Sequence, residues 1–151
     1  MAQRACIDHA AALVRDVPGP VLEMGLGNGR TYDHLRETLR DREIFVCERL
    51  VAAHPDCVPP ASNLILGDAR ETLPQLWDKF ARQMALAHLD LGTGEADANM
   101  RLAAEVAPLI APLMRPNAVV VSEPAIELPG WLALPLPLGV REGRYHLYRV
   151  S

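Results

Sequence analysis

Short apolar runs alternate with longer stretches along the chain up to residue 121, and most of those stretches place apolar residues at helical spacing. This alternation predicts strands that are connected through helices. Each parallel pairing of strands needs a crossover of about a dozen residues, and right-handed crossovers put helices on both faces of the sheet. The runs lie at residues 21–24, 43–47, 63–66, 84–89 and 118–121. The pattern therefore predicts a doubly wound, Rossmann-like α/β fold.

The rest of the chain follows a different pattern. Residues 131–138 and 144–150 are expected to be two extended pieces joined around the glycines at 139 and 143, which is a hairpin signal. Together with the earlier runs they make a mostly parallel, seven-stranded sheet that ends in a C-terminal antiparallel hairpin. The length of 151 residues fits one domain, residues 1–151.

Residues 122–130 lead from the last parallel strand to the hairpin and contain Pro124 and Pro129, so they are too short for a full helix. One face of the sheet is then expected to lie partly bare. The apolar side chains beside it are Trp131, Leu132, Leu134, Leu136 and Leu138. Because such a patch usually marks a contact surface, we expect a homodimer or higher oligomer that uses residues 124–138.

Composition narrows the class of protein. The net charge of -4 argues against a domain that binds nucleic acid by neutralising phosphates. The three cysteines form no C-x-x-C pair, which favours reduced thiols in the cytoplasm over disulfides or a zinc site. We find no apolar core of a signal peptide and no apolar run long enough to span a membrane. We therefore expect a soluble cytoplasmic protein without a membrane or nucleic-acid partner.

Alternate glycines follow the first expected strand at positions 25, 27 and 29, just before an expected helix. Ligands of such sheets bind at the carboxyl ends of the strands. Glycine permits a positive φ and a close approach to a ligand, and the helix N-terminus offers free N–H groups to an anion. This turn is therefore predicted to bind a cofactor. The dinucleotide fingerprint would need a small residue at position 30, where the chain has Arg30, so NAD fits poorly.

The pattern Glu-x-Gly-x-Gly-x-Gly at 23–29 resembles motif I of the class I S-adenosylmethionine-dependent methyltransferases. The resemblance extends over residues 17–122, because Cys47-Glu48, Leu66-Gly67-Asp68-Ala69 and His88-Leu89-Asp90 follow the next expected strands in order. It implies S-adenosyl-L-methionine as the cofactor and transfer of its methyl group to a small molecule. The implied cofactor-binding residues are Glu23, Gly25, Leu26, Gly27, Asn28, Gly29, Glu48, Arg49, Asp68, Ala69 and Asp90.

The resemblance also implies a role for each part. The methionine end of the cofactor would lie over residues 25–29 near Glu23, and its methyl group would point toward Asp90. Glu48 would accept hydrogen bonds from the ribose hydroxyls. Asp68 and the backbone of Ala69 would meet the adenine, although Asp68 can equally cap the following helix in a capping box with Glu71.

His88 and Asp90 are candidates for catalysis. Side chains two apart on an extended segment face the same way, so Asp90 can orient His88 as a base toward the acceptor. The alternative is that His88 only faces the cofactor or the core. Too few ligands follow the fourth and fifth strands for a magnesium site, so we predict no metal. Two other functions stay open: an NAD(P)-linked oxidoreductase, and a non-catalytic module for nucleoside binding or oligomerisation.

Overall fold

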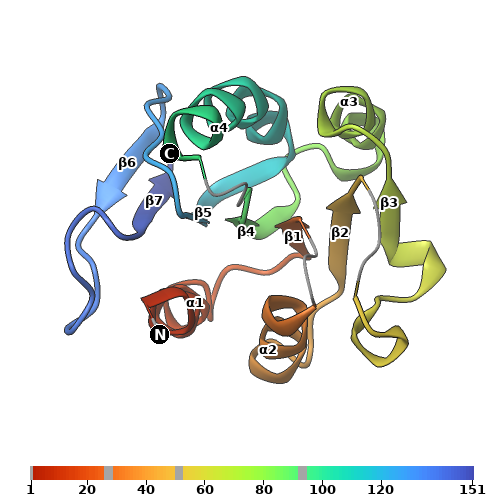
Figure 1. Cartoon of the computed structure of the whole chain (residues 1–151), viewed down its shortest axis with the longest axis horizontal. Coiled ribbons are helices and arrows are strands. Elements are labelled where there is room, and N and C mark those ends of the chain that lie inside the picture. The colour runs from red at the N-terminus through yellow and green to blue at the C-terminus, as the bar shows by residue number, and fades with distance from the viewer. Residues whose placement is uncertain (1, 26–28, 50–52, 92–94) are drawn as a thin grey trace.

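The computed structural model describes residues 2–25, 29–49, 53–91 and 95–151. In this part of the chain seven strands form one sheet in the order β3-β2-β1-β4-β5-β7-β6 (Figure 1). The strands are β1 (Val21–Met24), β2 (Ile44–Glu48), β3 (Leu64–Leu66), β4 (Met84–Leu89), β5 (Met114–Ser122), β6 (Trp131–Leu134) and β7 (His146–Val150). The first five pair in parallel, and β7 runs antiparallel between β5 and β6. The predicted fold class is confirmed.

Four α-helices cover the two faces of the sheet (Figure 1). One face carries α1 (Ala2–Leu13) and α2 (Arg30–Thr38), and the other carries α3 (Ala69–Phe80) and α4 (Ala96–Ile110). Three short 3-10 helices complete the described elements: η1 (Pro55–Cys57), η2 (Ala61–Asn63) and η3 (Ala111–Leu113). No helix within the described ranges has the length and apolar character that crossing a bilayer requires.

The core has two halves, one on each face of the sheet. Consecutive strand residues point to opposite faces, so Val21 of β1 packs on the α1 side and Leu22 packs on the α3 side. Both halves exclude water from the central strands, and β4 is buried along its whole length. Burial on both faces explains why the parallel strands are continuous apolar runs in the sequence.

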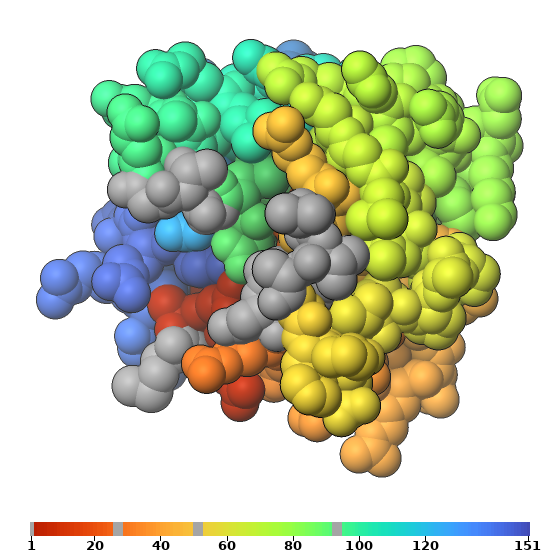
Figure 2. Space-filling view, turned by 45° about the vertical axis from the view of Figure 1, so that its right-hand side comes forward, coloured from red at the N-terminus to blue at the C-terminus, as the bar shows by residue number. Residues whose placement is uncertain are grey.

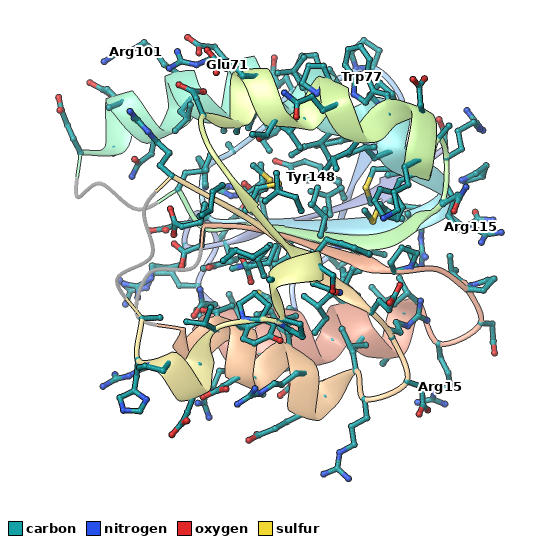
Figure 3. The ribbon with its side chains drawn as sticks, turned by 90° about the vertical axis from the view of Figure 1, so that its right-hand side faces the viewer. Arg15, Glu71, Trp77, Arg101, Arg115 and Tyr148 are labelled. Atoms are coloured by element: carbon teal, nitrogen blue, oxygen red, sulfur yellow. The ribbon has the colours of Figure 1, made fainter. Side chains whose placement is uncertain are left out.

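The segment between β5 and β6 forms no helix, as predicted, but it does cover the sheet. Ile126 is buried there, and its backbone N–H donates to the Tyr148 hydroxyl at 2.8 Å. Tyr148 lies between the sheet and the helices above it (Figure 3). Trp131 packs against Tyr148 with ring centroids 6.2 Å apart and is only 7% exposed. The expectation that Trp131 lies on a bare face is therefore wrong, while Leu132 is 62% exposed and Leu138 fully exposed.

Candidate functional site

The carboxyl ends of the central strands are held together by backbone hydrogen bonds that continue past the strands. The Gly25 N–H donates to the Cys47 carbonyl at 2.8 Å, and the Asp90 N–H donates to the Met24 carbonyl at 3.0 Å. The turns after β1, β2 and β4 therefore lie side by side. This is the edge at which ligands bind in sheets of this kind.

Gly25 has a φ of +92°, and a Cβ at this position would collide with the carbonyl oxygen of Asp90. Only glycine allows both the backbone conformation and the close approach of the two turns. Gly29 precedes α2 with a φ of +84°, and a Cβ there would lie 2.5 Å from the Cβ of Cys57. The other predicted residues of this turn, Leu26, Gly27 and Asn28, lie outside the described residues.

A cavity of about 340 Å³ opens at this edge. Of the predicted cofactor-binding residues it brings together Gly25, Glu48, Arg49, Asp68, Ala69 and Asp90. Its remaining lining residues are Met24, Cys47, Gly67, Arg70, Leu91, Leu102 and Val106. Leu102 and Val106 come from α4 and stand four positions apart, so helical spacing places them on one face of the helix. Their spacing could not show that this face also reaches the strand ends.

Asp68 caps α3, as the second interpretation of this residue predicted. Its carboxylate accepts from the backbone N–H of Arg70 at 2.9 Å and forms an ion pair with the guanidinium of the same residue at 2.8 Å. These contacts hold the pKa of Asp68 well below its usual range. Arg70 also reaches Glu105 on α4 at 3.1 Å. The ion pair with Arg70 is a feature that the sequence analysis missed.

Glu48 ends β2 and lines the same cavity. Its Oε1 accepts from the backbone N–H of Arg49 at 2.8 Å, which turns the carboxylate toward the strand end. The Gly67 N–H donates to the Glu48 carbonyl at 3.0 Å, so the turn after β3 is tied to the same residue. Glu48 and Asp68 therefore stand on neighbouring turns of one cavity.

Glu23 and His88 form a fully buried pair beneath this edge. Glu23 Oε1 lies 2.7 Å from His88 Nδ1, and neither side chain is exposed. Burial raises the pKa of Glu23 to about 7 against the opposing effect of His88, and the carboxylates of Asp90 and Glu48 raise it further. The second oxygen of Glu23, Oε2, accepts no hydrogen bond from the described residues.

The other ring nitrogen of His88 meets a tyrosine. His88 Nε2 lies 3.1 Å from the hydroxyl of Tyr145, and the two rings are stacked with an interplanar angle of 3°. Burial opposes protonation of His88, but Glu23, and beyond it Asp90 and Glu123, outweigh this effect and raise the pKa of the imidazole.

The predicted pairing of Asp90 with His88 is not formed, because both ring nitrogens of His88 are occupied by Glu23 and Tyr145. Asp90 instead contacts Gln3 of α1, whose Nε2 lies 3.4 Å from Oδ2. Sequence reasoning missed Glu23 as the partner of His88, and it missed Tyr145 and Gln3 entirely. Within the described residues no three His, Cys, Asp or Glu side chains are grouped to hold a metal ion, and metal independence stays a prediction.

Comparisons with known proteins identify the family of the chain. A family model described as S-adenosyl-L-methionine methyltransferase matches residues 1–150. A crystal structure of S-adenosyl-L-methionine methyl transferase from Silicibacter pomeroyi DSS-3 has 47% sequence identity and a TM-score of 0.96, over 99% of this chain and 92% of that one. The comparison with curated proteins gave no match.

Two more distant structures show the fold alone. The antibiotic-resistance methyltransferase Kmr has 13% identity and a TM-score of 0.56, over 97% of this chain and 92% of that one. The MycE methyltransferase of the mycinamycin biosynthetic pathway, in complex with Mg, SAH and mycinamycin VI, has 14% identity and a TM-score of 0.61, over 95% of this chain and 44% of that one. The family match over nearly the whole chain and the near relative at 47% identity decide the assignment: the chain belongs to the S-adenosyl-L-methionine methyltransferase family and uses S-adenosyl-L-methionine as its methyl donor.

Proposed function

We propose that the 340 Å³ cavity holds S-adenosyl-L-methionine and that the chain transfers the methyl group to a small-molecule acceptor. The observation that carries the proposal is the convergence of Gly25, Glu48, Asp68 and Asp90, from four different turns, on this one cavity. A nucleoside with an amino-acid tail needs separate contacts for its base, its ribose and its tail, and these turns can provide them.

The nucleoside end of the donor is assigned to the turns after β2 and β3. The Glu48 carboxylate is a bidentate acceptor, which suits a pair of ribose hydroxyls. Asp68 Oδ1 accepts twice from Arg70 and Oδ2 accepts once, so Oδ2 keeps one lone pair and capping α3 is compatible with accepting from the adenine amino group. Leu102 and Val106 supply an apolar wall beside them, which suits the face of a base.

The methionine end is assigned to the turn after β1. Glu23 Oε2 is a buried carboxylate oxygen without a hydrogen-bond donor among the described residues, and such an oxygen is costly to leave unpaired. Glu23 lies beneath the cavity and does not line it, so it is proposed to add negative charge below the ammonium group of the donor. Asp90, which lines the cavity after β4, is proposed to lie beside the methyl group.

The donor supplies an already activated methyl group on a sulfonium. The remaining task of the protein is to align a nucleophile with the methyl–sulfur bond and, where the nucleophile carries a proton, to accept that proton. The chain's net charge of -4 supports a small molecule over nucleic acid as the acceptor. No observation favours an NAD(P)-linked oxidoreductase or a non-catalytic module.

Thermal-shift titration tests the proposal. A ligand that binds only the native state raises the melting temperature with its concentration. S-adenosyl-L-methionine and S-adenosylhomocysteine are expected to raise it, and NAD is expected to leave it unchanged. If neither sulfur ligand changes the melting temperature, the cavity does not hold the methyl donor.

We also propose that two or more copies associate through residues 124–138. Strand β6 is the outermost strand on its side of the sheet, and it exposes Leu132, while the loop after it exposes Leu138. Light scattering at micromolar concentration is expected to give at least twice the monomer mass, and a monomer mass would contradict the proposal.

A cytoplasmic location is proposed in addition, supported by the three free cysteines.

A further inference from the structure

A second, larger cavity of about 580 Å³ lies beside the same edge of the sheet, where His146 pairs with Ser122 at the end of β5. It is lined by β6, β7 and the loop that joins them, and this loop extends beside α1 (Figures 1 and 2). Its wall is mostly apolar, and Glu142, Tyr145 and His146 add polar groups. Its volume falls in the usual range for small-molecule sites.

Gln3 links the two cavities. Its Nε2 contacts Asp90, which lines the donor cavity, at 3.4 Å, and its side chain also hydrogen-bonds to Tyr145, which lines the larger cavity. The hydroxyl of Thr31 donates to Gln3 Oε1 at 3.1 Å, and this contact orients the Gln3 amide with its NH2 group toward Asp90. Gln3 therefore connects Asp90 of the donor cavity with Tyr145 of the larger cavity.

The hydrogen bonds also fix the direction in which a proton can move. When Glu23 is ionised, its Oε1, which lies 2.7 Å from His88 Nδ1, can only accept, so the neutral imidazole carries its proton on Nδ1 and keeps a lone pair on Nε2. The Tyr145 hydroxyl donates to that lone pair at 3.1 Å. The oxygen of Tyr145 then keeps two lone pairs directed away from His88; one faces the side chain of Gln3, and the other can accept a proton from a ligand.

We propose that Tyr145, His88 and Glu23 form a proton-accepting chain for the methyl acceptor, and that the acceptor is a neutral small molecule with a hydroxyl group on an apolar body, held in the 580 Å³ cavity. This inference rests on the proposed function. Tyr145 is the catalytic residue, and His88 and Glu23 act through it as positioning residues.

We infer a hydroxyl acceptor because the three residues serve to remove a proton. A neutral amine already has a nucleophilic lone pair, whereas a hydroxyl is a weak nucleophile until its proton is removed. The apolar wall and the carboxylate of Glu142 also disfavour an anionic acceptor, because burying an unpaired charge is costly.

The step balances as a single transfer. The acceptor oxygen forms a bond to the donor's methyl carbon while the carbon–sulfur bond breaks, and its electron pair stays on the sulfur. The hydroxyl proton of the acceptor passes to the Tyr145 oxygen, and the proton of Tyr145 passes to His88 Nε2. The imidazolium then faces the carboxylate of Glu23, and the proton leaves to solvent after the products.

The pKa shifts of Tyr145 and His88 support proton transfer in this direction. Burial raises the pKa of Tyr145 far above its usual range, so Tyr145 passes a proton on and does not hold a negative charge. His88 has to be neutral to accept, so activity is lost as the pH falls through the raised pKa of His88. The titratable groups that act on His88 come from β1, from the turns after β4 and β5, and from the residue before β7: Glu23, Asp90, Glu123 and Tyr145.

Binding of two matched probes tests the site. With S-adenosylhomocysteine present, para-propylphenol and propylbenzene are titrated by ligand-detected NMR. The phenol is expected to bind about tenfold more tightly, as one hydrogen bond of about 1.4 kcal/mol gives. Tyr145→Phe is expected to remove this difference. Tyr32→Phe, which takes the hydroxyl from another buried tyrosine on the same face of the sheet, is expected to keep it.

Methylation of para-propylphenol tests the proton-accepting role of Tyr145, His88 and Glu23. Formation of para-propylanisole, followed by mass spectrometry, is expected to rise with pH to a plateau in the wild type and to fall about a hundredfold in Tyr145→Phe. His88→Asn is expected to flatten the rise, which a purely structural role of His88 would not do. Melting temperatures measured with S-adenosylhomocysteine check that each variant is folded and binds the donor site.

The outcomes separate the two proposals. The proton-accepting role of Tyr145, His88 and Glu23 is wrong, while the proposed function stands, if S-adenosylhomocysteine raises the melting temperature but neither probe binds. The same conclusion follows if Tyr145→Phe keeps the preference for the phenol, or if His88→Asn keeps the pH dependence. If S-adenosylhomocysteine does not bind, the proposed function fails as well.

Discussion

Glu23 and His88 are direct neighbours in the parallel β1–β4 ladder, and their side chains meet at 2.7 Å on the α1 side of the sheet. Neither side chain is exposed to water. Two ionisable groups placed this way share their protons, and their charge states depend on each other. The pair therefore ties the stability of the central strands to pH.

Glu23→Gln tests that link. Folding raises the pKa of Glu23 from 4.5 to about 7, so its favourable contribution is present below its unfolded pKa and is lost as the pH rises through about 7. Between those pH values the wild type is expected to lose about 3 kcal/mol more of its free energy of unfolding than Glu23→Gln does. Urea denaturation over a pH series measures this. The exposed Glu37→Gln serves as the control, and parallel curves for the wild type and Glu23→Gln would refute the prediction.

Gly25→Ala is expected to disrupt the turn after β1. The new Cβ would combine a φ of +92° with a collision against the backbone of Asp90, so we expect a loss of more than about 2 kcal/mol in stability and no thermal shift with S-adenosylhomocysteine. Gly139→Ala is a matched control, because its φ is +87° but its Cβ would meet no atom within 4 Å. Equal effects of the two changes would show that the contact with Asp90 is unimportant.

Glu48→Gln is expected to weaken the binding of S-adenosylhomocysteine about tenfold. The amide offers one acceptor oxygen without a charge, where the carboxylate offers two, and hydrogen bonds to ionised groups are the stronger ones. Calorimetric titration measures the affinity, with Glu37→Gln on the exposed face of α2 as the control for charge alone. If Glu48→Gln leaves the affinity unchanged, Glu48 does not bind the ribose.

Trp131→Ala is expected to destabilise the protein by about 3–5 kcal/mol, because the side chain is 7% exposed and packs on Tyr148. Leu132→Ala, one residue along the same strand but 62% exposed, is expected to change the stability by less than about 1 kcal/mol. Chemical denaturation of the two variants checks whether the segment before β6 closes the core. Similar losses would contradict the burial of Trp131.

The sequence predicted the sheet because its apolar runs are buried on both faces and are separated by helices long enough to cross over. It also predicted which turns line the 340 Å³ cavity, since residues such as Glu48 and Asp68 lie at or just after the ends of strands that meet at one edge. Local pattern carries this information. The capping role of Asp68 was visible for the same reason, because a cap involves only neighbouring residues.

Contacts between distant strands could not be predicted in this way. Glu23 meets His88 because β1 and β4 pair in one particular register, and two residues 65 positions apart in the chain carry no local signal of that register. Tyr145 and Gln3 reach the same place only because β7 inserts beside β5 and α1 packs beneath. Trp131 was misjudged because an extended segment, and not a helix, covers the sheet there.

Strand β6 touches the sheet only through β7, although it comes earlier in the chain. During synthesis β6 therefore has no partner until residues 146–150 have emerged, while β1 to β5 can already pair. A chain folds from its N-terminal end as it is made, so β1 to β5 are expected to pair before β6 and β7 do. The residues that line the 340 Å³ cavity belong to the early part and Tyr145 to the late part, so the proposed methyl-donor site is expected to form before the wall of the larger cavity does.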